Sequence, residues 1–397
     1  MTAPAPPLPE DPLVAEVERF AEQRSLARRA VEIDRDAVFP DAEYRALGEA
    51  GLLGLHTSTA HGGRGLPLLR VGVALFHLAR RGGTAFAKLA LQPEFASVLA
   101  EHGSAELIAR HFQPMLRGQH LVGNHVTEPG AGSDAGALSM TARLERGRYL
   151  LDGTKSEAAF ATEADAAIVY AKVPSASGRL GGITAFLVPQ DLPGIRRRVV
   201  PDLGERWMRR GTVEYENVPV PSDHVLGEVG RGFDYVKKEF TRERALLGAI
   251  YLGVAWSSWE ETVEHVGART AFGGPLASQE GVSFPLVEDW ARLESAWLYV
   301  ERTLRRLDEG ETASAQSALS KWMATDVALA AIDHAIQFHG GKGYSSALPH
   351  ERRWRDVRSG GLAHGPAEVL HVIAGRELWP RPKGPAEATG GSRVKRT

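Results

Sequence analysis

The amino-acid sequence predicts an α+β fold in which helices dominate, arranged as a helical region, a β region and a second helical region. Three observations predict this order. Residues 13–120 carry apolar side chains three and four positions apart, residues 121–232 alternate with a period of two between Gly and Pro residues, and residues 233–379 return to the helical spacing. The length of 397 residues is enough for two or three domains of about 100–200 residues each.

The elements are expected in the following order. Residues 1–12 are rich in Pro and are expected to be disordered. In the first helical region, Asp41 after Pro40 is expected to begin a helix and Gly51 to end it. Segments such as ITAFLVP and TVEYENVPVP indicate a small antiparallel β domain, a sheet or a barrel. Long helical segments such as SALSKWMATDVALAAIDHAIQFHG follow, and residues 380–397, rich in Pro, Gly, Lys and Arg, are expected to form a disordered tail.

Composition excludes several classes of function. The net charge of −2 gives no overall field to attract nucleic acid. The absence of Cys excludes disulfides, a thiolate nucleophile and Cys-ligated metal, and the 14 His residues show no HExxH or comparable spacing, so we expect no metal site. There is no GxSxG hydrolase motif, no apolar run of about 18 residues for a membrane span, and no signal peptide at the N-terminus, so a cytoplasmic enzyme is expected.

The motif HVTEPGAGSD, residues 125–134, opens the β region. Its glycines, including Gly132, let backbone N–H groups approach a ligand closely, and Thr127 and Ser133 add hydroxyl groups. Such a loop is suited to a phosphate or the edge of a flavin ring. The alternative is a Gly-rich turn between strands. It is not a dinucleotide fingerprint, because no GxGxxG stands between a strand and a helix.

Residues 127–134, TEPGAGSD, resemble the signature of the acyl-CoA dehydrogenase superfamily. Other segments resemble further blocks of that family in the same order, and the resemblance covers roughly residues 13–378: AGLLGL (50–55), GGRG (62–65), ENVPVP (216–221) and VLG (225–227). The resemblance implies an N-terminal helical domain, a middle β domain and a C-terminal four-helix domain. It also implies FAD as the cofactor and an acyl thioester, carried by CoA or by a carrier protein, as the substrate.

The resemblance implies two groups of FAD-binding residues. The first is in the β region: Val126, Thr127, Gly132 and Ser133. The second binds the phosphates and adenine of the FAD of a neighbouring subunit and lies in the motifs RTAFG and QFHGGKGY: Arg269, Phe272, Gln337, Gly340 and Gly341. An Arg suits bidentate phosphate binding. Without the resemblance, these motifs would indicate a surface charge, a core ring and a helix that ends in a Gly cap. With it, the protein is expected to be a homodimer or homotetramer.

Three positions depart from the family pattern. Where the family has an aromatic residue that shields the flavin and a hydroxyl that bonds its redox edge, this chain has Glu157 and Ala159. A carboxylate near the flavin would lower its reduction potential. With a shifted alignment, Phe160 or Thr162 would take these roles. Glu280 stands where the family has a Gln that contacts the cofactor.

Two residues are candidates for the base that removes the substrate α-proton. His364, in AHGPAEV (363–369), occupies the position at which the family carries an acid, and a neutral imidazole with a pKa of about 6.5 accepts a proton near pH 7. Glu243 stands immediately before Arg244, where one branch of the family carries its catalytic Glu. The alternatives are that His364 is a tolerated residue in a degenerate site and that Glu243 forms a solvated ion pair.

The resemblance also implies a substrate site formed by Ser133, Arg244 and Gly365. In it, the backbone N–H of His364 and a ribityl hydroxyl of the flavin would hold the thioester oxygen, an oxyanion-hole arrangement. We therefore expect FAD-dependent α,β-dehydrogenation of an acyl thioester, with an electron-transfer flavoprotein or oxygen as the acceptor. Two alternatives remain open: a flavin-dependent monooxygenase or oxidase on the same fold, and a redox-silent thioester-binding homologue with a degraded flavin site.

Overall fold

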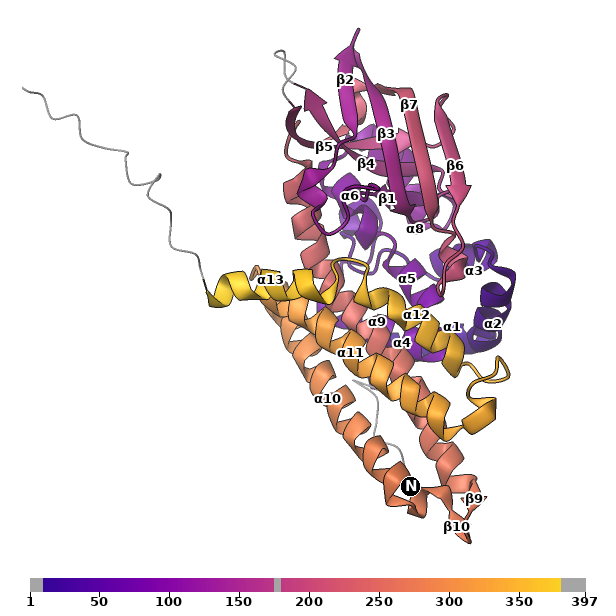
Figure 1. Cartoon of the computed structure of the whole chain (residues 1–397). Coiled ribbons are helices and arrows are strands. Elements are labelled where there is room, and N and C mark those ends of the chain that lie inside the picture. Colours follow the sequence, from indigo (N-terminus) through magenta and orange to yellow (C-terminus); the bar gives the residue numbers. More distant parts are fainter. Residues whose placement is uncertain (1–9, 175–179, 380–397) are drawn as a thin grey trace, which may run out of the picture.

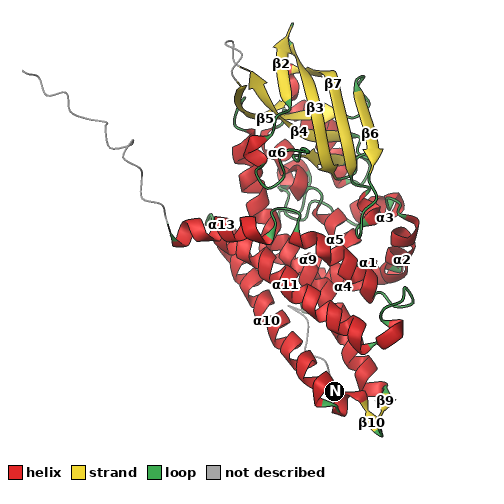
Figure 2. Cartoon of the chain, viewed as in Figure 1, coloured by secondary structure: helices red, strands yellow, loops and turns green. Residues whose placement is uncertain are grey.

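A helical layer, a β-sheet and a bundle of long helices follow one another along the chain (Figures 1 and 2), so the predicted fold class is confirmed. The computed structural model describes residues 10–174 and 180–379. The segments predicted to be disordered, 1–12 and 380–397, lie outside the described residues except for residues 10–12. There, the carboxylate of Asp11 accepts a hydrogen bond from the backbone N–H of Leu13 and caps the first helix.

The N-terminal region is helical, as its periodicity predicts. Asp41 begins a helix and Gly51, with φ 65°, follows its end, which confirms the expected boundaries. The Gly residue is suited to this place because a left-handed conformation is unstrained without a Cβ. The helices of this region are α1 Pro12–Gln23, α2 Leu26–Asp36, α3 Asp41–Glu49, α4 Leu68–Gly82, α5 Thr84–Leu91, α6 Ser97–His102, α7 Ala105–Leu107 and α8 Gln113–Leu116.

The middle region forms one eight-stranded sheet with the order β6-β7-β3-β2-β4-β5-β8, in which β1 pairs with β4. Most neighbours are antiparallel, as expected, but β1 runs parallel to β4, and β2 meets β4 in parallel at Thr141 and Lys172. No hairpin joins β1 to β4, and the long connection through β2 and β3 allows the parallel direction. The strands are β1 Val122–His125, β2 Thr141–Glu145, β3 Arg148–Ala158, β4 Ala166–Pro174, β5 Leu180–Pro189, β6 Ile195–Val199, β7 Gly211–Pro221 and β8 Val225–Leu226.

The C-terminal region is built around one long helix, α9. Its 37 residues give a length of about 55 Å at 1.5 Å per residue. Its middle is buried on every side, because α4, α10 and α11 pack around it. A Cβ at Gly253 would lie 2.2 Å from the Phe76 carbonyl oxygen, so a Gly is needed where α9 crosses α4. The elements are α9 Gly232–Ala268, β9 Thr270–Ala271, β10 Gly274–Pro275, α10 Glu280–Asp308, α11 Ser314–Phe338, α12 His350–Arg358 and α13 Ala367–Leu378.

Helix α12 is fixed against the rest of the chain by ion pairs, and this determines where the loop after it lies. Arg355 forms a bidentate pair with Asp34 on α2, with contacts of 3.0 and 2.6 Å. Asp356 accepts a hydrogen bond from the backbone N–H of Glu205 at 2.6 Å. The α12–α13 loop is therefore held between the N-terminal helices and the bundle, as Figure 1 shows.

Candidate functional site

The two candidate bases lie together. His364 is in the loop between α12 and α13, and Glu243 is on α9; the His364 Nε2 and Glu243 Oε2 atoms are 3.1 Å apart. The side chain of Glu243 is 1% exposed and that of His364 is 21% exposed. No hydrogen bond of good geometry reaches either Glu243 oxygen or His364 Nδ1 within the described residues. Buried polar atoms without partners are costly, and these three can still accept a proton or a hydrogen bond.

Two aromatic rings fix the plane of the imidazole. The ring of Phe95 stacks on His364 with centroids 5.3 Å apart, and Phe240 contacts it edge-on at 5.1 Å. Phe240 lies one turn before Glu243 on α9, so the same helix supplies an aromatic contact and the carboxylate. The imidazole is therefore held in one orientation toward Glu243.

The charges around His364 oppose its protonation. Burial, followed by the positive charges of Lys321, Lys88 and Arg244, lowers the pKa of His364 well below its usual value. Burial, followed by the nearby carboxylate of Glu239, raises the pKa of Glu243 well above its usual value. The two groups titrate together, and a proton added to the pair goes first to the carboxylate.

The backbone on both sides of His364 is held by cations. Lys321 Nζ donates to the carbonyl oxygens of Ala363 and Gly365, the latter at 2.7 Å. Arg244 Nε donates to the carbonyl oxygen of His364 at 2.9 Å. The backbone N–H of His364 forms no hydrogen bond within the described residues, and this is the group that the sequence predicts to hold a thioester oxygen. The predicted substrate contacts of Arg244 and Gly365 stay predictions.

The Gly-rich loop 125–134 is anchored from behind by a buried ion pair. Lys155 Nζ lies 2.9 Å from Glu128 Oε1 and 2.9 Å from the carbonyl oxygen of Val126. Glu128 also accepts hydrogen bonds from the backbone N–H groups of Ser139, at 2.6 Å, and Met140. These contacts determine the course of the loop. They do not involve the hydroxyl groups of Thr127 and Ser133.

The remaining groups of this loop fit the polar edge of a cofactor. The hydroxyls of Thr127 and Ser133 form no hydrogen bond within the described part of the chain, and a Cβ built on Gly130 or Gly132 would meet nothing within 4 Å. A loop with open backbone and unbonded hydroxyls is suited to a polar ligand edge. The predicted flavin contacts of Val126, Thr127, Gly132 and Ser133 stay predictions.

Glu157, which replaces the family's aromatic residue, forms an ion pair that the sequence did not reveal. Glu157 has φ 55° and pairs with Arg210 at 3.1 Å. Phe160 is 2% exposed and packs against Phe39 and Trp207, and Thr162 bonds to the adjacent Glu163, so both proposed substitutes have other contacts. The charge of the Glu157 carboxylate is therefore partly offset by Arg210, which it shares with Asp202.

The second group of predicted FAD residues lies at the far end of the bundle. The stacked rings of His265 and His339, with centroids 4.2 Å apart, show that the ends of α9 and α11 meet there. The predicted residues of this group are all exposed, and Phe272 is 92% exposed: Arg269, Phe272, Gln337, Gly340 and Gly341. Glu280, the position of the missing Gln, begins α10 and is exposed, with Gln279 as its N-cap.

This end is remote from His364. Arg269 follows Arg244 by 25 positions, which is about 37 Å along a helix axis at 1.5 Å per residue. The structure thus brings together His364, Glu243, Arg244 and Gly365, and separates them from the group around Arg269. Sequence analysis missed Lys321 and Lys88. A lone Lys in the otherwise uncharged segment SALSKWMA, in the first half of α11, was the available signal for Lys321.

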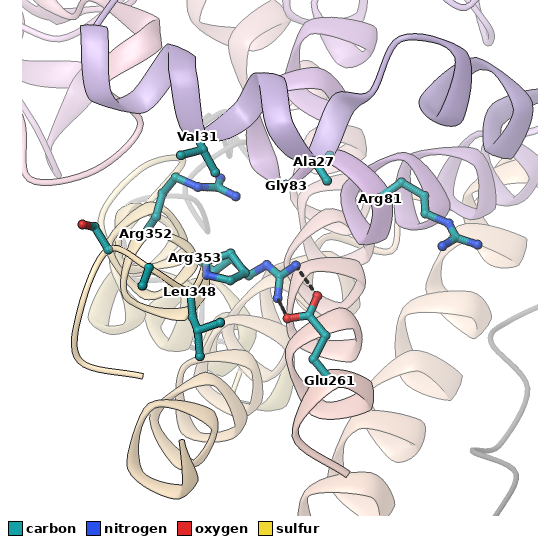
Figure 3. Close-up of a pocket in the computed structure, with 12 residues that line it drawn as sticks. Ala27, Val31, Arg81, Gly83, Glu261, Leu348, Arg352 and Arg353 are labelled. Carbon is teal, nitrogen blue, oxygen red and sulfur yellow. Dashed lines mark hydrogen bonds and ion pairs between the residues drawn. The ribbon is translucent and has the colours of Figure 1, made fainter. Parts of the chain in front are cut away.

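A cavity of about 270 Å³ lies elsewhere, between α2, the α4–α5 turn and α12 (Figure 3). Arg353 forms a two-fold contact with Glu261 at 2.8 Å beside it, and Arg352 lines it. None of the predicted site residues lines this cavity. Among the described residues, no group of three His, Asp or Glu side chains could bind a metal ion, and no helix in residues 10–174 or 180–379 is long and apolar enough to cross a bilayer.

Three models of protein domains match consecutive parts of the chain. Residues 10–119, 123–218 and 230–379 match the models of the N-terminal, middle and C-terminal domains of acyl-CoA dehydrogenases. The chain is 33% identical to the mitochondrial short-chain specific acyl-CoA dehydrogenase of Mus musculus over 362 residues, 90% of this chain and 87% of the relative.

A carrier-protein enzyme is similarly related. The chain is 33% identical to the L-prolyl-[peptidyl-carrier protein] dehydrogenase of Pseudomonas fluorescens, over 86% of this chain and 90% of the relative. Among solved structures, butyryl-CoA dehydrogenase from Megasphaera elsdenii superposes with a TM-score of 0.86 at 26% identity, covering 95% of this chain and all of that one (100%).

Proposed function

The chain belongs to the acyl-CoA dehydrogenase family, and from this premise we propose that it uses FAD to oxidise an acyl thioester between its α and β carbons, with His364 and Glu243 acting together as the base. The observation that carries the proposal is the 3.1 Å contact between His364 Nε2 and Glu243 Oε2. When bound, FAD supplies the acceptor for the hydride that leaves the β-carbon.

His364 and Glu243 divide the proton transfer between them. With Nε2 directed at Glu243, Nδ1 is the nitrogen without a partner, and it is the atom that takes the α-proton. An imidazolium is disfavoured here by Lys321, Lys88 and Arg244. The proton on Nε2 therefore passes to Glu243, whose raised pKa favours the protonated acid. Neither residue alone combines the imidazole lone pair that takes the α-proton with a stable place for the proton.

The N–H of His364, which forms no hydrogen bond within the described residues, would polarise the substrate. A donor directed at the thioester oxygen stabilises the negative charge that develops on it when the α-proton leaves. Because this donor is a backbone group, the replacement of the family's acid by His364 leaves it in place. Thr127, Ser133 and the open glycines of the 125–134 loop would hold the cofactor beside it.

The substrate class follows from the relatives. One is named for a short-chain acyl-CoA and another for a prolyl group on a peptidyl carrier protein, so we propose an acyl group carried as a thioester by CoA or by a carrier protein. An electron-transfer flavoprotein or oxygen would then accept the electrons, as the sequence predicts. Measuring kcat/KM for the same acyl group on CoA and on a carrier protein would show which of the two carriers the enzyme prefers.

The experiment that tests the proposal begins with the visible spectrum of the protein purified with FAD. Anaerobic addition of candidate acyl thioesters should bleach the flavin, and His364→Gln and Glu243→Gln should each slow the bleaching by about 100-fold or more, the usual scale of general-base catalysis. His371→Gln, at an exposed position on α13, is the control and should not change the rate.

Two results would contradict the proposal. A protein that retains no FAD would favour the redox-silent alternative, and unchanged bleaching in both variants would exclude the His364–Glu243 pair as the base. Rapid reoxidation by air with a hydroxylated product would instead favour the monooxygenase alternative.

A further inference from the structure

Helix α11 carries a lysine whose surroundings differ from those of the other buried lysines. Lys321 is 0% exposed, and no carboxylate lies within ion-pair distance of it in the described residues. Lys88, by contrast, lies 2.5 Å from Glu205, and Lys155 lies 2.9 Å from Glu128. A buried ammonium group without a counter-ion is unfavourable. Within the described part of the chain, the hydrogen bonds of Lys321 go to backbone carbonyl oxygens, and these belong to the residues on either side of His364.

The two bonds of Lys321 fix the direction of one amide group. The described peptide bonds are all trans, so the Ala363 carbonyl and the His364 N–H belong to one planar unit and point in opposite directions. Lys321 holds that carbonyl on the side of α11. The N–H of His364 must then point away from α11, where no acceptor among residues 10–174 and 180–379 bonds to it.

Arg244 completes the arrangement from α9. Its Nε donates to the next carbonyl, that of His364, and Lys321 donates to the one after, that of Gly365. Three consecutive carbonyl oxygens therefore point at two cations. His364 has φ 56° and Gly365 has φ 101°, and a left-handed His persists only where its surroundings enforce it. The hydrogen bonds from Lys321 and Arg244 hold the backbone in this conformation.

We propose that Lys321 is a positioning residue that directs the backbone N–H of His364 toward the carbonyl oxygen of the thioester substrate. The inference rests on the proposed function, because it assigns the substrate oxygen to that N–H. The inference goes beyond the proposed function by assigning a role to Lys321 on α11, a residue that is not part of the His364–Glu243 pair. Burial, followed by Arg244 and Lys88, lowers the pKa of Lys321 to about 7. Its ammonium form adds a positive charge near His364, as do Lys88 and Arg244, while Glu243 brings a carboxylate.

The test compares two substitutions that separate hydrogen bonding from charge. Lys321→Met removes both, whereas Lys321→Gln removes the charge and keeps an N–H donor. Ser320→Ala is the matched control, since Ser320 is also fully buried on α11 but bonds to Thr303 on α10 at 2.9 Å. Each variant of the full-length protein, loaded with FAD, is first checked for cooperative unfolding.

Two readouts are independent of turnover. Amide hydrogen exchange in residues 362–366 should become at least about tenfold faster in Lys321→Met, and less so in Lys321→Gln, because a lost buried charge-assisted hydrogen bond changes a local equilibrium by about that factor. The NMR titration of His364, assigned with His364→Gln, should move to higher pH in both Lys321 variants, since both lose the positive charge. Ser320→Ala should change neither.

Kinetics then connect the arrangement to catalysis. If the N–H acts on the developing charge, Lys321→Met should lower kcat by about tenfold or more with little change in KM. Wild-type exchange and an unchanged His364 titration in a folded Lys321→Met would overturn the inference. If exchange and titration respond as expected but His364→Gln retains full turnover, the proposed function fails and the structural role of Lys321 stands.

Discussion

At the scale of single residues, the contact between His364 and Glu243 determines how the site should respond to pH. The base is active when His364 is neutral and Glu243 is ionised. Burial and Glu239 raise the pKa of Glu243, so its protonation, which inactivates the pair, occurs above the pH at which an ordinary Glu titrates. Activity should therefore be lost as pH falls through the raised pKa of Glu243.

We predict that the acid limb of the rate of anaerobic flavin reduction lies above pH 4.5, the ordinary value for Glu. In Glu243→Gln, the limb should move to lower pH, because the remaining base, His364, has a pKa that burial and nearby cations lower. Stopped-flow reduction across a pH series measures both limbs. An acid limb at the same pH in wild type and variant would show that Glu243 does not titrate with the base.

A second residue-scale prediction concerns Glu157. Its side chain is 57% exposed and lies 3.1 Å from Arg210, which also pairs with Asp202. Exposed ion pairs contribute about 0–1 kcal/mol to stability, and the Arg offsets the field of the carboxylate. Glu157→Gln should shift the potential of bound FAD by less than about 30 mV, equivalent to about 1.4 kcal/mol for two electrons.

The matched variant is Arg210→Gln, which leaves Glu157 unpaired. Spectroelectrochemical titration should then show a lower potential, because an uncompensated carboxylate disfavours the reduced anion. A large upward shift in Glu157→Gln alone would mean that Arg210 does not neutralise it.

At the scale of the elements, sequence patterns indicated which segments are helices and strands more reliably than which segments meet. Asp41 and Gly51 bound α3 as predicted, because capping is decided within a few residues. Arg244 and His364 lie 120 positions apart, and their contact depends on how α12 is tied to α2 and how α9 passes beneath the loop. No local pattern contains that information, so the sequence presented Glu243 and His364 as alternatives.

The parallel pairing of β1 with β4 escaped prediction for a related reason. Alternation indicates strands, but not which strands become neighbours. The pairing brings His125 beside Val169 and places the Gly-rich loop that follows β1 over the end of β3. There, Lys155 on β3 reaches Glu128, a contact that fixes the predicted cofactor loop.

That ion pair gives an element-scale prediction. Lys155→Met would leave the buried carboxylate of Glu128 without its cation, which should lower the free energy of unfolding by about 3–5 kcal/mol and weaken FAD retention. Urea denaturation and gel filtration with FAD measure the two effects. The double variant Glu128→Gln/Lys155→Met removes the unpaired charge and should recover part of the stability; no recovery would show that the charge is not the cause.

At the scale of the whole molecule, the separation between the two predicted groups of FAD residues constrains the assembly. The α12–α13 loop, which carries His364, lies toward the sheet, whereas β9 and β10 lie at the opposite end of the bundle (Figure 1). Arg269 and Phe272 flank β9, and both are exposed, as is Gln337 near the end of α11. One cofactor cannot reach both groups of a single chain, because Arg269 is about 37 Å along α9 from Arg244. Both groups serve one cofactor only if a second copy supplies the distal group.

This arrangement predicts complementation between two inactive variants. His364→Gln removes the base, and Arg269→Gln removes the predicted phosphate contact, so each homo-oligomer should have low activity at limiting FAD. In a hybrid dimer, one site combines the intact His364 of one chain with the intact Arg269 of the other and is fully wild type, while the second site carries both changes. Hybrids should therefore recover about half of the wild-type activity per dimer.

The hybrids can be made by co-expression with two different affinity tags and isolated by sequential purification, with the double variant His364→Gln/Arg269→Gln paired with wild type as the control. In that control hybrid, each shared site would carry one change, so activity should stay low. If each site were instead built within one chain, the outcomes would be exchanged: the first hybrid would stay inactive, and the control would retain half of the activity. The two hybrids contain the same substitutions in the same number, so only their distribution between the chains distinguishes a shared site from a site within one chain.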